Sequence, residues 1–342
     1  MGRTVLVTGG SGYFGTVLCG RALACGDRVR VLDLNPPPAS LDVEYVAGDV
    51  RDASVVRAAC EGVDVVLHNV AQVPLARDRS LFSSVNVVGT ANVLVAARDA
   101  RVAKVVHTSS SAIFGIPERN PVTEDTPPRP LEAYGRAKLE AERLCRDAAA
   151  GGLDVTIVRP RTILGHGRLG IVAVLFEFVA DGAPVFVLGG GRNRYQFVHA
   201  DDLADACLRA SARPGPAVYN VGALEFATMR ETLQALVDHA RTGSRIRSLP
   251  VAPARLAMQA LARVGQAPFA PYHWLLYAES LWFDVTRARE ELGWEPRHSN
   301  AAMVVESYEW YLAHRNELDA RGGSHHQSPV RPGLLRLLKH LP

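Results

Sequence analysis

Residues 8–15 read Thr8-Gly9-Gly10-Ser11-Gly12-Tyr13-Phe14-Gly15, and they stand between a short β-branched run and an apolar helical pattern. Residues 4–8 predict a strand, and residues 17–24 predict a helix. Glycines at such a junction permit a tight turn and let the backbone approach a pyrophosphate at the helix N-terminus. Residues 10–15 match G-x-G-x-x-G, and residues 9–15 match G-x-x-G-x-x-G. Because the motif has a strand before it and a helix after it, the stretch predicts a dinucleotide-binding βαβ unit.

Strand and helix patterns alternate through the first half of the chain. Further strands are expected at 28–32, 43–46, 64–68, 104–108 and 154–158, and helices at 53–60, 82–98 and 134–149. This alternation predicts the α/β class, with a Rossmann-type doubly wound parallel sheet. After Arg159-Pro160 the pattern loosens, with helices expected at 171–181, 201–211, 229–240 and 253–264 and strands at 185–188, 197–199 and 218–221.

The change of pattern suggests three parts of the chain. We expect an NAD-binding Rossmann domain over 1–165 and a smaller substrate-binding lobe over 166–320, some of whose segments return to the sheet. A basic amphipathic tail over 321–342 follows, with leucines at helical spacing. Such a tail could lie on an acidic membrane surface, dock onto the body or cover a partner subunit, and at this length docking is favoured.

Composition excludes several classes of protein. The 342 residues are 48% apolar and 21% charged with a formal net charge of +3, which argues against a disordered chain and against nucleic-acid binding. There is no run of 18 apolar residues, so no membrane-spanning helix is expected. The five cysteines are odd in number and lack CxxC spacing, which favours buried free thiols in the cytoplasm and no metal site.

Two aspartates follow predicted strands where a nucleotide would lie. Asp33 closes the second strand, where a carboxylate can accept hydrogen bonds from both ribose hydroxyls and would repel a 2′-phosphate. This position favours NAD over NADP. Asp49, in Ala47-Gly48-Asp49-Val50 after the third strand, is placed to meet the adenine ring.

A tyrosine and a lysine four residues apart open a predicted helix, in Tyr134-Gly-Arg-Ala-Lys138. Side chains at i and i+4 share one helical face, so the ammonium is expected to lower the pKa of the phenol towards neutral. The phenol would then exchange a proton with an alcohol or carbonyl oxygen. Ser110, at the end of the strand before it, can hydrogen-bond the same oxygen.

With these motifs in order, the chain resembles an extended short-chain dehydrogenase/reductase of the NAD-dependent epimerase/dehydratase superfamily over residues 3–315. The resemblance implies that Lys138 also holds the nicotinamide ribose, that Val70 and Ala71 line the cofactor through their backbone, and that Asn86 supports the active site. The implied catalytic residues are Ser110, Tyr134, Lys138 and Asn86. The implied NAD-binding residues are Gly9, Gly12, Tyr13, Phe14, Gly15, Asp33, Asp49, Val50, Val70, Ala71, Tyr134 and Lys138.

The resemblance also selects among three serines and excludes one reaction. The family's active hydroxyl lies five residues before the glycine of its S-x-x-x-Y/F-G pattern, which is Ser110 counted from Gly115, with Ser111 as the main competitor. Sugar dehydratases of the family place Asp and Glu where this chain has Ser111 and Ala112. Sugar 4,6-dehydration therefore lacks its acid and base.

Substrate signals are mixed. Nucleotide-sugar enzymes of the family commonly carry Arg-Pro-x-Asn and an arginine before the F-V-x-x-D-D segment, where this chain has Thr162 and Tyr195. Arg161, Arg192 and Arg194 could restore part of the lost charge if they turn inward. The stretches from Arg159 to Gly165 and from His68 to Ala71 look more like those of the branch similar to 3β-hydroxysteroid dehydrogenases and 3-keto-acid reductases. An apolar stretch could line a hydrophobic pocket or be ordinary core: Met258, Leu261, Phe269, Tyr272, Trp274, Leu275, Leu276 and Tyr277.

These observations predict an NAD-dependent oxidoreductase that moves hydride between nicotinamide and a secondary alcohol or ketone, with a hydrophobic or hydroxysteroid-like substrate favoured. The alternative is a nucleotide-sugar 4-epimerase that keeps NAD bound, and a minor alternative is a catalytically silent cofactor sensor. The family implies a homodimer through the helices at 81–98 and 134–149. His199 is expected to be structural, and His325-His326 a solvated pair.

Overall fold

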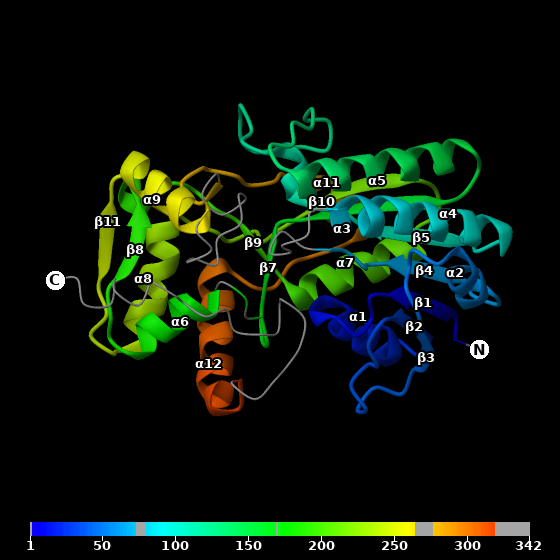
Figure 1. Cartoon of the computed structure of the whole chain (residues 1–342), viewed down its shortest axis with the longest axis horizontal. Helices are drawn as coiled ribbons and strands as arrows, with labels where there is room; N and C mark the ends of the chain where they lie inside the picture. The colour runs from blue at the N-terminus through cyan, green and yellow to red at the C-terminus, as the bar shows by residue number, and fades with distance from the viewer. Residues whose placement is uncertain (1, 73–79, 169, 171, 264–275, 319–342) are drawn as a thin grey trace.

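Seven parallel strands form the central sheet of the computed structural model, which describes residues 2–72, 80–168, 170, 172–263 and 276–318 (Figure 1). The strand order is β10-β6-β5-β4-β1-β2-β3. The strands are β1 (Thr4–Thr8), β2 (Arg28–Asp33), β3 (Glu44–Ala47), β4 (Val65–His68), β5 (Lys104–Thr108), β6 (Val155–Pro160) and β10 (Ala217–Val221). This is the doubly wound order, and the Rossmann-type α/β fold expected from the alternating pattern is confirmed.

Helices cover both faces of this sheet, which explains the nearly continuous apolar runs of its inner strands. Every residue of β1, β4, β5 and β6 is buried. One face packs on α1 (Tyr13–Ala24) and α7 (Ala200–Ala212), and the other on α2 (Ala53–Cys60), α4 (Gly89–Asp99) and α5 (Ala133–Ala150). In Figure 1 the two sets of helices lie below and above the sheet.

A smaller group of elements lies at the other end of the molecule in Figure 1. It has its own apolar cluster, centred on Phe176, Leu236 and Tyr308. The helices are α6 (Val172–Ala180), α8 (Met229–Ala240), α9 (Val251–Arg263) and α12 (Asn300–Leu318); the paired strands are β8 (Val185–Leu188) with β11 (Ile246–Leu249) and β7 (Thr162–Leu164) with β9 (Phe197–His199). Between these strands the chain returns to the main sheet as β10, which pairs with β6.

Several elements differ from the sequence-based expectation. The helix expected at 82–98 begins earlier and consists of α3 (Ser80–Ser83), a π-helical turn (Ser84–Val88) and α4. Strands β7 and β11 and helices α11 (Thr286–Leu292) and α12 were not expected. The two strands have three and four residues, and each is stabilised by a partner distant in sequence, so local pattern gives them little signal.

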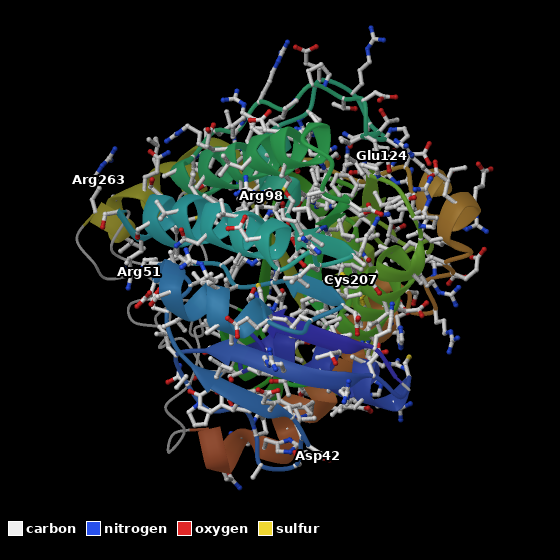
Figure 2. The ribbon with its side chains drawn as sticks, turned by 90° about the vertical axis from the view of Figure 1, so that its right-hand side faces the viewer. Asp42, Arg51, Arg98, Glu124, Cys207 and Arg263 are labelled. Carbon is white, nitrogen blue, oxygen red and sulfur yellow. The ribbon has the colours of Figure 1, made fainter. Side chains whose placement is uncertain are left out.

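The structure also places the five cysteines and the apolar segment at 80–99. All five cysteines are free, and four are buried; Cys207 lies inside, on α7, whereas Asp42, Arg51 and Arg98 lie on the surface (Figure 2). Ser80–Asp99 is long and apolar enough to cross a membrane by length and composition. It buries Val93 and Ala97 against the sheet, as a core helix of an α/β domain does.

A buried carboxylate joins the catalytic end of the sheet to helix α5. Glu142 is fully buried, and its two oxygens accept hydrogen bonds from Nε and Nη2 of Arg159, each at 2.8 Å. Ser109 Oγ also donates to the same carboxylate, at 2.7 Å. The network therefore fixes the end of β5, the end of β6 and one face of α5 relative to one another.

We expect Glu142→Gln to lower the free energy of unfolding by roughly 3–5 kcal/mol, because it leaves the Arg159 guanidinium buried without a counter-ion. Glu140→Gln, on the same helix but in an exposed pair with Arg143, is the matched control and should cost less than about 0.5 kcal/mol. Urea unfolding of both variants measures the difference. Equal costs would show that the buried pair does not hold the fold together.

Candidate functional site

The glycine loop forms a cradle between β1 and α1. Gly9 has a φ of +72°, and its N–H donates to Leu32 O at 2.8 Å. A Cβ on Gly15 would lie 2.0 Å from Gly9 O, so α1 packs directly on the turn. Gly12 caps α1 without a side-chain hydrogen bond, and the first turn carries no acid. Because the N-terminal N–H groups of α1 are left to a ligand, the loop fits a pyrophosphate.

Asp33 lies at the carboxyl end of β2 and closes one side of this cradle. Its carboxylate accepts from the backbone N–H of Ser11 at 3.1 Å and of Asn35 at 3.0 Å. The side chain is half-buried beside the loop, which suits contact with ribose hydroxyls. Asp49 instead forms an ion pair with Arg51, and this pairing holds the pKa of Asp49 below its usual value.

The chain after β4 forms the other side of the cradle. Thr8 Oγ1 accepts from the N–H of Asn69 at 3.2 Å and of Val70 at 3.4 Å, so this segment lies against the glycine loop. Asn86, in the π-helical turn, accepts from Gln72 N–H at 2.7 Å and donates to Gln72 O at 3.1 Å. Asn86 thus positions the backbone that includes Ala71. The side chain of Val50 is buried and would meet a Cβ on Gly89.

Tyr134, Lys138 and Ser110 come together at the carboxyl ends of β5 and β6. Tyr134 is hydrogen-bonded to Ser110, and Lys138 Nζ donates to Thr108 O at 2.8 Å one turn further along α5. The expectation that Lys138 lowers the pKa of Tyr134 towards neutral is wrong for this structure. Burial raises the pKa of Tyr134 to about 12, because desolvation outweighs the Ser110 hydrogen bond. Burial also lowers the pKa of Lys138 to about 8.

The three neighbouring serines have different partners. Ser109 donates to the buried Glu142 carboxylate, and Ser111 Oγ accepts from Arg161 Nη1 at 2.7 Å. Ser110 caps the short 3-10 helix Ser111–Phe114 and is the serine that contacts Tyr134. This geometry supports Ser110 as the active hydroxyl.

Two arginines that follow β6 belong to the site: Arg161, which was expected to add charge if it turned inward, and Arg168, which was not predicted. Arg168 lies over the Tyr13 ring, with its guanidinium carbon 5.7 Å from the ring centroid, and its Nε donates to Ile163 O at 3.3 Å. Burial lowers the pKa of Arg168 to about 10, and its charge interacts with both Tyr13 and Tyr134. Arg161 is buried, and its Nη1 donates to Ser111 Oγ. The position after Arg159-Pro160 points to Arg161, whereas Arg168 lies beyond β7 in no motif that the sequence patterns identified.

His199, His166 and Glu306 form a cluster beyond Tyr13, with their ligand atoms within 4.8 Å of one another. Asp201 N–H donates to His199 Nδ1 at 3.1 Å, so Nε2 carries the ring proton and donates to Glu306 at 3.0 Å. This tautomer leaves no lone pair on Nε2 for a metal ion. His199 therefore caps α7, in agreement with a structural role.

Several described residues at positions that bear on diphosphate binding have other partners or lie on the surface. Tyr195 and Thr162, which stand where nucleotide-sugar enzymes carry other residues, are hydrogen-bonded to each other at 2.8 Å. Arg192 and Arg194 are exposed, and the Arg194 guanidinium lies 4.9 Å from the ring centroids of Phe226 and Trp282.

Part of the apolar stretch can be placed. Leu276 is buried and Tyr277 donates to Phe186 O at 3.2 Å, as ordinary core residues do, and Met258 and Leu261 are half-buried on α9. Phe269, Tyr272, Trp274 and Leu275 lie outside the described residues, as do the tail at 321–342 and His325-His326.

Known proteins resemble this chain in both sequence and structure. The model of the NAD dependent epimerase/dehydratase family matches residues 5–222. The uncharacterized protein y4nG of Sinorhizobium fredii is 52% identical over 99% of this chain and 86% of its own length. The UDP-glucose 4-epimerase of Mycolicibacterium smegmatis is 30% identical over 90% of this chain and 97% of its own.

A ketoreductase and a solved epimerase structure also resemble the chain. A 4-hydroxy-2-methyl-3-oxo-4-farnesyl-3,4-dihydroquinoline-1-oxide ketoreductase of Stigmatella aurantiaca is 28% identical over 85% of this chain and 91% of its own length. Among solved structures, the UDP-glucose 4-epimerase of Thermotoga maritima superposes with a TM-score of 0.76 at 23% identity, covering 91% of this chain and 99% of that one. The last likeness concerns the fold alone.

We expect this protein to bind NAD(H) at least about ten times more tightly than NADP(H), because the Asp33 carboxylate would face the 2′-phosphate. Asp33→Ser combined with Leu34→Arg should reverse the preference, since Leu34 is 67% exposed beside it. Fluorescence titration with both nucleotides measures the ratio, with Asp42→Ser as an exposed control. Equal affinities in the wild type would contradict the role of Asp33.

Proposed function

The chain belongs to the NAD dependent epimerase/dehydratase family, and from this premise we propose that it is an oxidoreductase that moves hydride between NAD and a secondary alcohol or ketone. The observation that carries the proposal is the Ser110–Tyr134 hydrogen bond at the carboxyl edge of the sheet, with Lys138 buried one helical turn away. These groups lie on the side of the sheet where ligands of doubly wound folds bind.

The described residues fit an NAD molecule. The glycine turn and the N-terminus of α1 would hold the pyrophosphate, and Asp33 would hold the adenosine ribose. Lys138 and the backbone at Val70 and Ala71 would meet the nicotinamide half. When bound, NAD supplies a carbon that accepts or returns a hydride. Arg168, over the Tyr13 ring, would face the negative charge of the phosphates.

The protonation state of Tyr134 favours the reductive direction. With a pKa raised to about 12, the phenol keeps its proton at neutral pH and can donate it to a carbonyl oxygen. Ser110 Oγ lies beside it and can donate to the same oxygen. The positive charge that lowers the pKa of Tyr134 is that of Arg168, which would stabilise the phenolate that remains, while Lys138 is fixed by its hydrogen bond to Thr108 O.

The substrate is proposed to be a ketone or alcohol without a nucleotide diphosphate. The support is that Tyr195 and Thr162 bond to each other and Arg194 lies on aromatic rings, so these positions offer a diphosphate little charge. The ketoreductase of S. aurantiaca is a relative of comparable identity. Dehydration is disfavoured, because Ser111 and Ala112 offer neither acid nor base there.

A nucleotide-sugar epimerase is the second candidate. The match to the M. smegmatis UDP-glucose 4-epimerase, which extends along nearly the whole of both chains, favours it. An epimerase would use the same Tyr134 and Ser110 for oxidation and for return of the hydride. A cytoplasmic location and a homodimer stay predictions. Val88 and Val95 are exposed, and they lie within the helix at 81–98 that is predicted to take part in the dimer.

Tyr134→Phe tests the proposed chemistry. It should lower kcat by roughly 10²–10⁴, the usual contribution of one acid/base group, while NAD affinity changes little. Lys138→Met should lower both turnover and NAD affinity. Stopped-flow reduction of a ketone panel and NAD titration separate the two effects, and wild-type turnover by Tyr134→Phe on the true substrate would refute the mechanism.

Calorimetry separates the two candidate substrates. Loss of two charge-assisted phosphate contacts, each worth roughly 1.5–3 kcal/mol, should leave UDP, dTDP and GDP with Kd values in about the millimolar range or weaker. Hydrophobic ketones should bind more tightly to the NAD-loaded protein. Micromolar binding of any nucleoside diphosphate would instead support the epimerase.

A further inference from the structure

Arg161 is a buried cation that the proposed chemistry does not yet use. It directly follows β6 and is 2% exposed. Its Nη1 donates to Ser111 Oγ at 2.7 Å, and its guanidinium carbon lies 4.7 Å from the Tyr195 ring centroid and 5.6 Å from that of Phe283. The guanidinium is therefore held in place by two aromatic rings and one hydroxyl, next to the catalytic Ser110.

The remaining edge of this guanidinium lacks a partner. Within the described part of the chain, Nε and Nη2 are buried and have no hydrogen-bond acceptor. These two atoms form one side of the planar fork with which arginine binds a carboxylate through two parallel hydrogen bonds. The unpaired edge is thus the one suited to bidentate recognition.

Arg159, two residues earlier, provides an internal comparison. It is also buried, at 1% exposed, and it also lies over an aromatic ring, that of Phe114 at 5.2 Å. Its Nε and Nη2 each bond a Glu142 oxygen at 2.8 Å. The same fork is therefore filled by a carboxylate in Arg159 and left unfilled by the described side chains in Arg161.

An uncompensated buried charge is costly, and the contacts of Arg161 repay only part of that cost. A cation–π contact and one hydrogen bond to a neutral hydroxyl are weak compared with the desolvation of a guanidinium. Buried cations in proteins are usually paired with an anion. A ligand that brings its own negative charge would supply the missing partner.

We propose that the Nε–Nη2 edge of Arg161 binds a carboxylate of the substrate, next to the carbon whose oxygen contacts Ser110 and Tyr134. This rests on the proposed function, since it uses the same site. Ser111, which follows Ser110 in the chain, holds Arg161, so the carboxylate would lie within a few bonds of the reacting carbon. The substrate class is then an oxo acid or hydroxy acid, including a uronic acid, in preference to a neutral ketone.

The first test needs no turnover. Arg161→Met removes the guanidinium and keeps a shorter apolar chain, and removal of an unpaired buried charge should raise the Tm of the ligand-free protein. Sodium formate, at ionic strength matched with sodium chloride, should raise the Tm of the wild type by roughly 2 °C or more and leave Arg161→Met unchanged. Arg194→Met, which removes an exposed arginine stacked on rings, should respond to formate as the wild type does.

Either a lower Tm of Arg161→Met than of the wild type, or the same formate response in both, would overturn the proposal. Each result would show that Arg161 is a packing residue and does not bind an anion. NAD affinity of the three proteins is measured in parallel. The three proteins should bind NAD equally well. A negative result in the formate experiment would therefore not contradict the Tyr134 mechanism. Wild-type turnover by Tyr134→Phe would likewise not contradict anion binding by Arg161.

The second test uses ligand pairs that differ in one carboxylate. UDP-glucuronic acid against UDP-glucose, and a β-hydroxy acid against its methyl ester, are titrated into the NAD-loaded protein. At least one acid should bind the wild type roughly ten- to a hundredfold more tightly than its neutral partner, and Arg161→Met should remove that difference. Absence of any preference for the acid in either pair would overturn the assignment.

Discussion

The carboxylate of Glu142 sits where the catalytic edge of the sheet meets helix α5, and the rest of the site depends on it. Arg159 binds it from β6, Ser109 from β5, and Arg146 from one turn along α5. Ser110 directly follows Ser109 in the chain, and Lys138 lies one turn before Glu142 on α5. Because Glu142 joins groups from β6, from the residue after β5 and from α5, the hydroxyl and the phenol can stay in hydrogen-bond contact without a ligand to hold them.

Burial then determines the chemistry that this geometry permits. The same desolvation raises the pKa of Tyr134, lowers those of Lys138 and Arg168, and makes the unpaired edge of Arg161 costly. A site with two buried cations, Lys138 and Arg161, and the half-buried Arg168 favours ligands that carry negative charge. The pyrophosphate of NAD would satisfy the charge near Tyr13, and a carboxylate would satisfy the charge near Ser111. The phenol, kept neutral, is suited to donate a proton.

The family match and the geometry of the site both indicate NAD as the cofactor. The relatives of similar identity differ from one another in their substrates. The family model covers the glycine loop, the Tyr134 helix and the segment up to β10. Relatives of similar identity include a nucleotide-sugar epimerase and a ketoreductase, so descent within this family leaves the reaction open. In this chain, the residues after β6 are the ones that bear on the substrate. Here Thr162 and Tyr195 bond to each other, and Arg161 and Arg168 supply the positive charge.

The order of motifs along the chain was enough to predict the parallel sheet, the glycine cradle, Asp33 and the Tyr134–Lys138 helix, because each depends on neighbours in sequence or on one strand-turn-helix unit. Short strands such as β7 and β11 were missed, since they are stabilised by partners far along the chain. The pKa of Tyr134 was predicted in the wrong direction, because helical spacing reveals a nearby lysine but not the desolvation that outweighs it. Tertiary structure alone decided that, among the described residues, Arg159 has a carboxylate partner while Nε and Nη2 of Arg161 have no acceptor, because side-chain pairing across β5, β6 and α5 is set by packing and not by sequence distance.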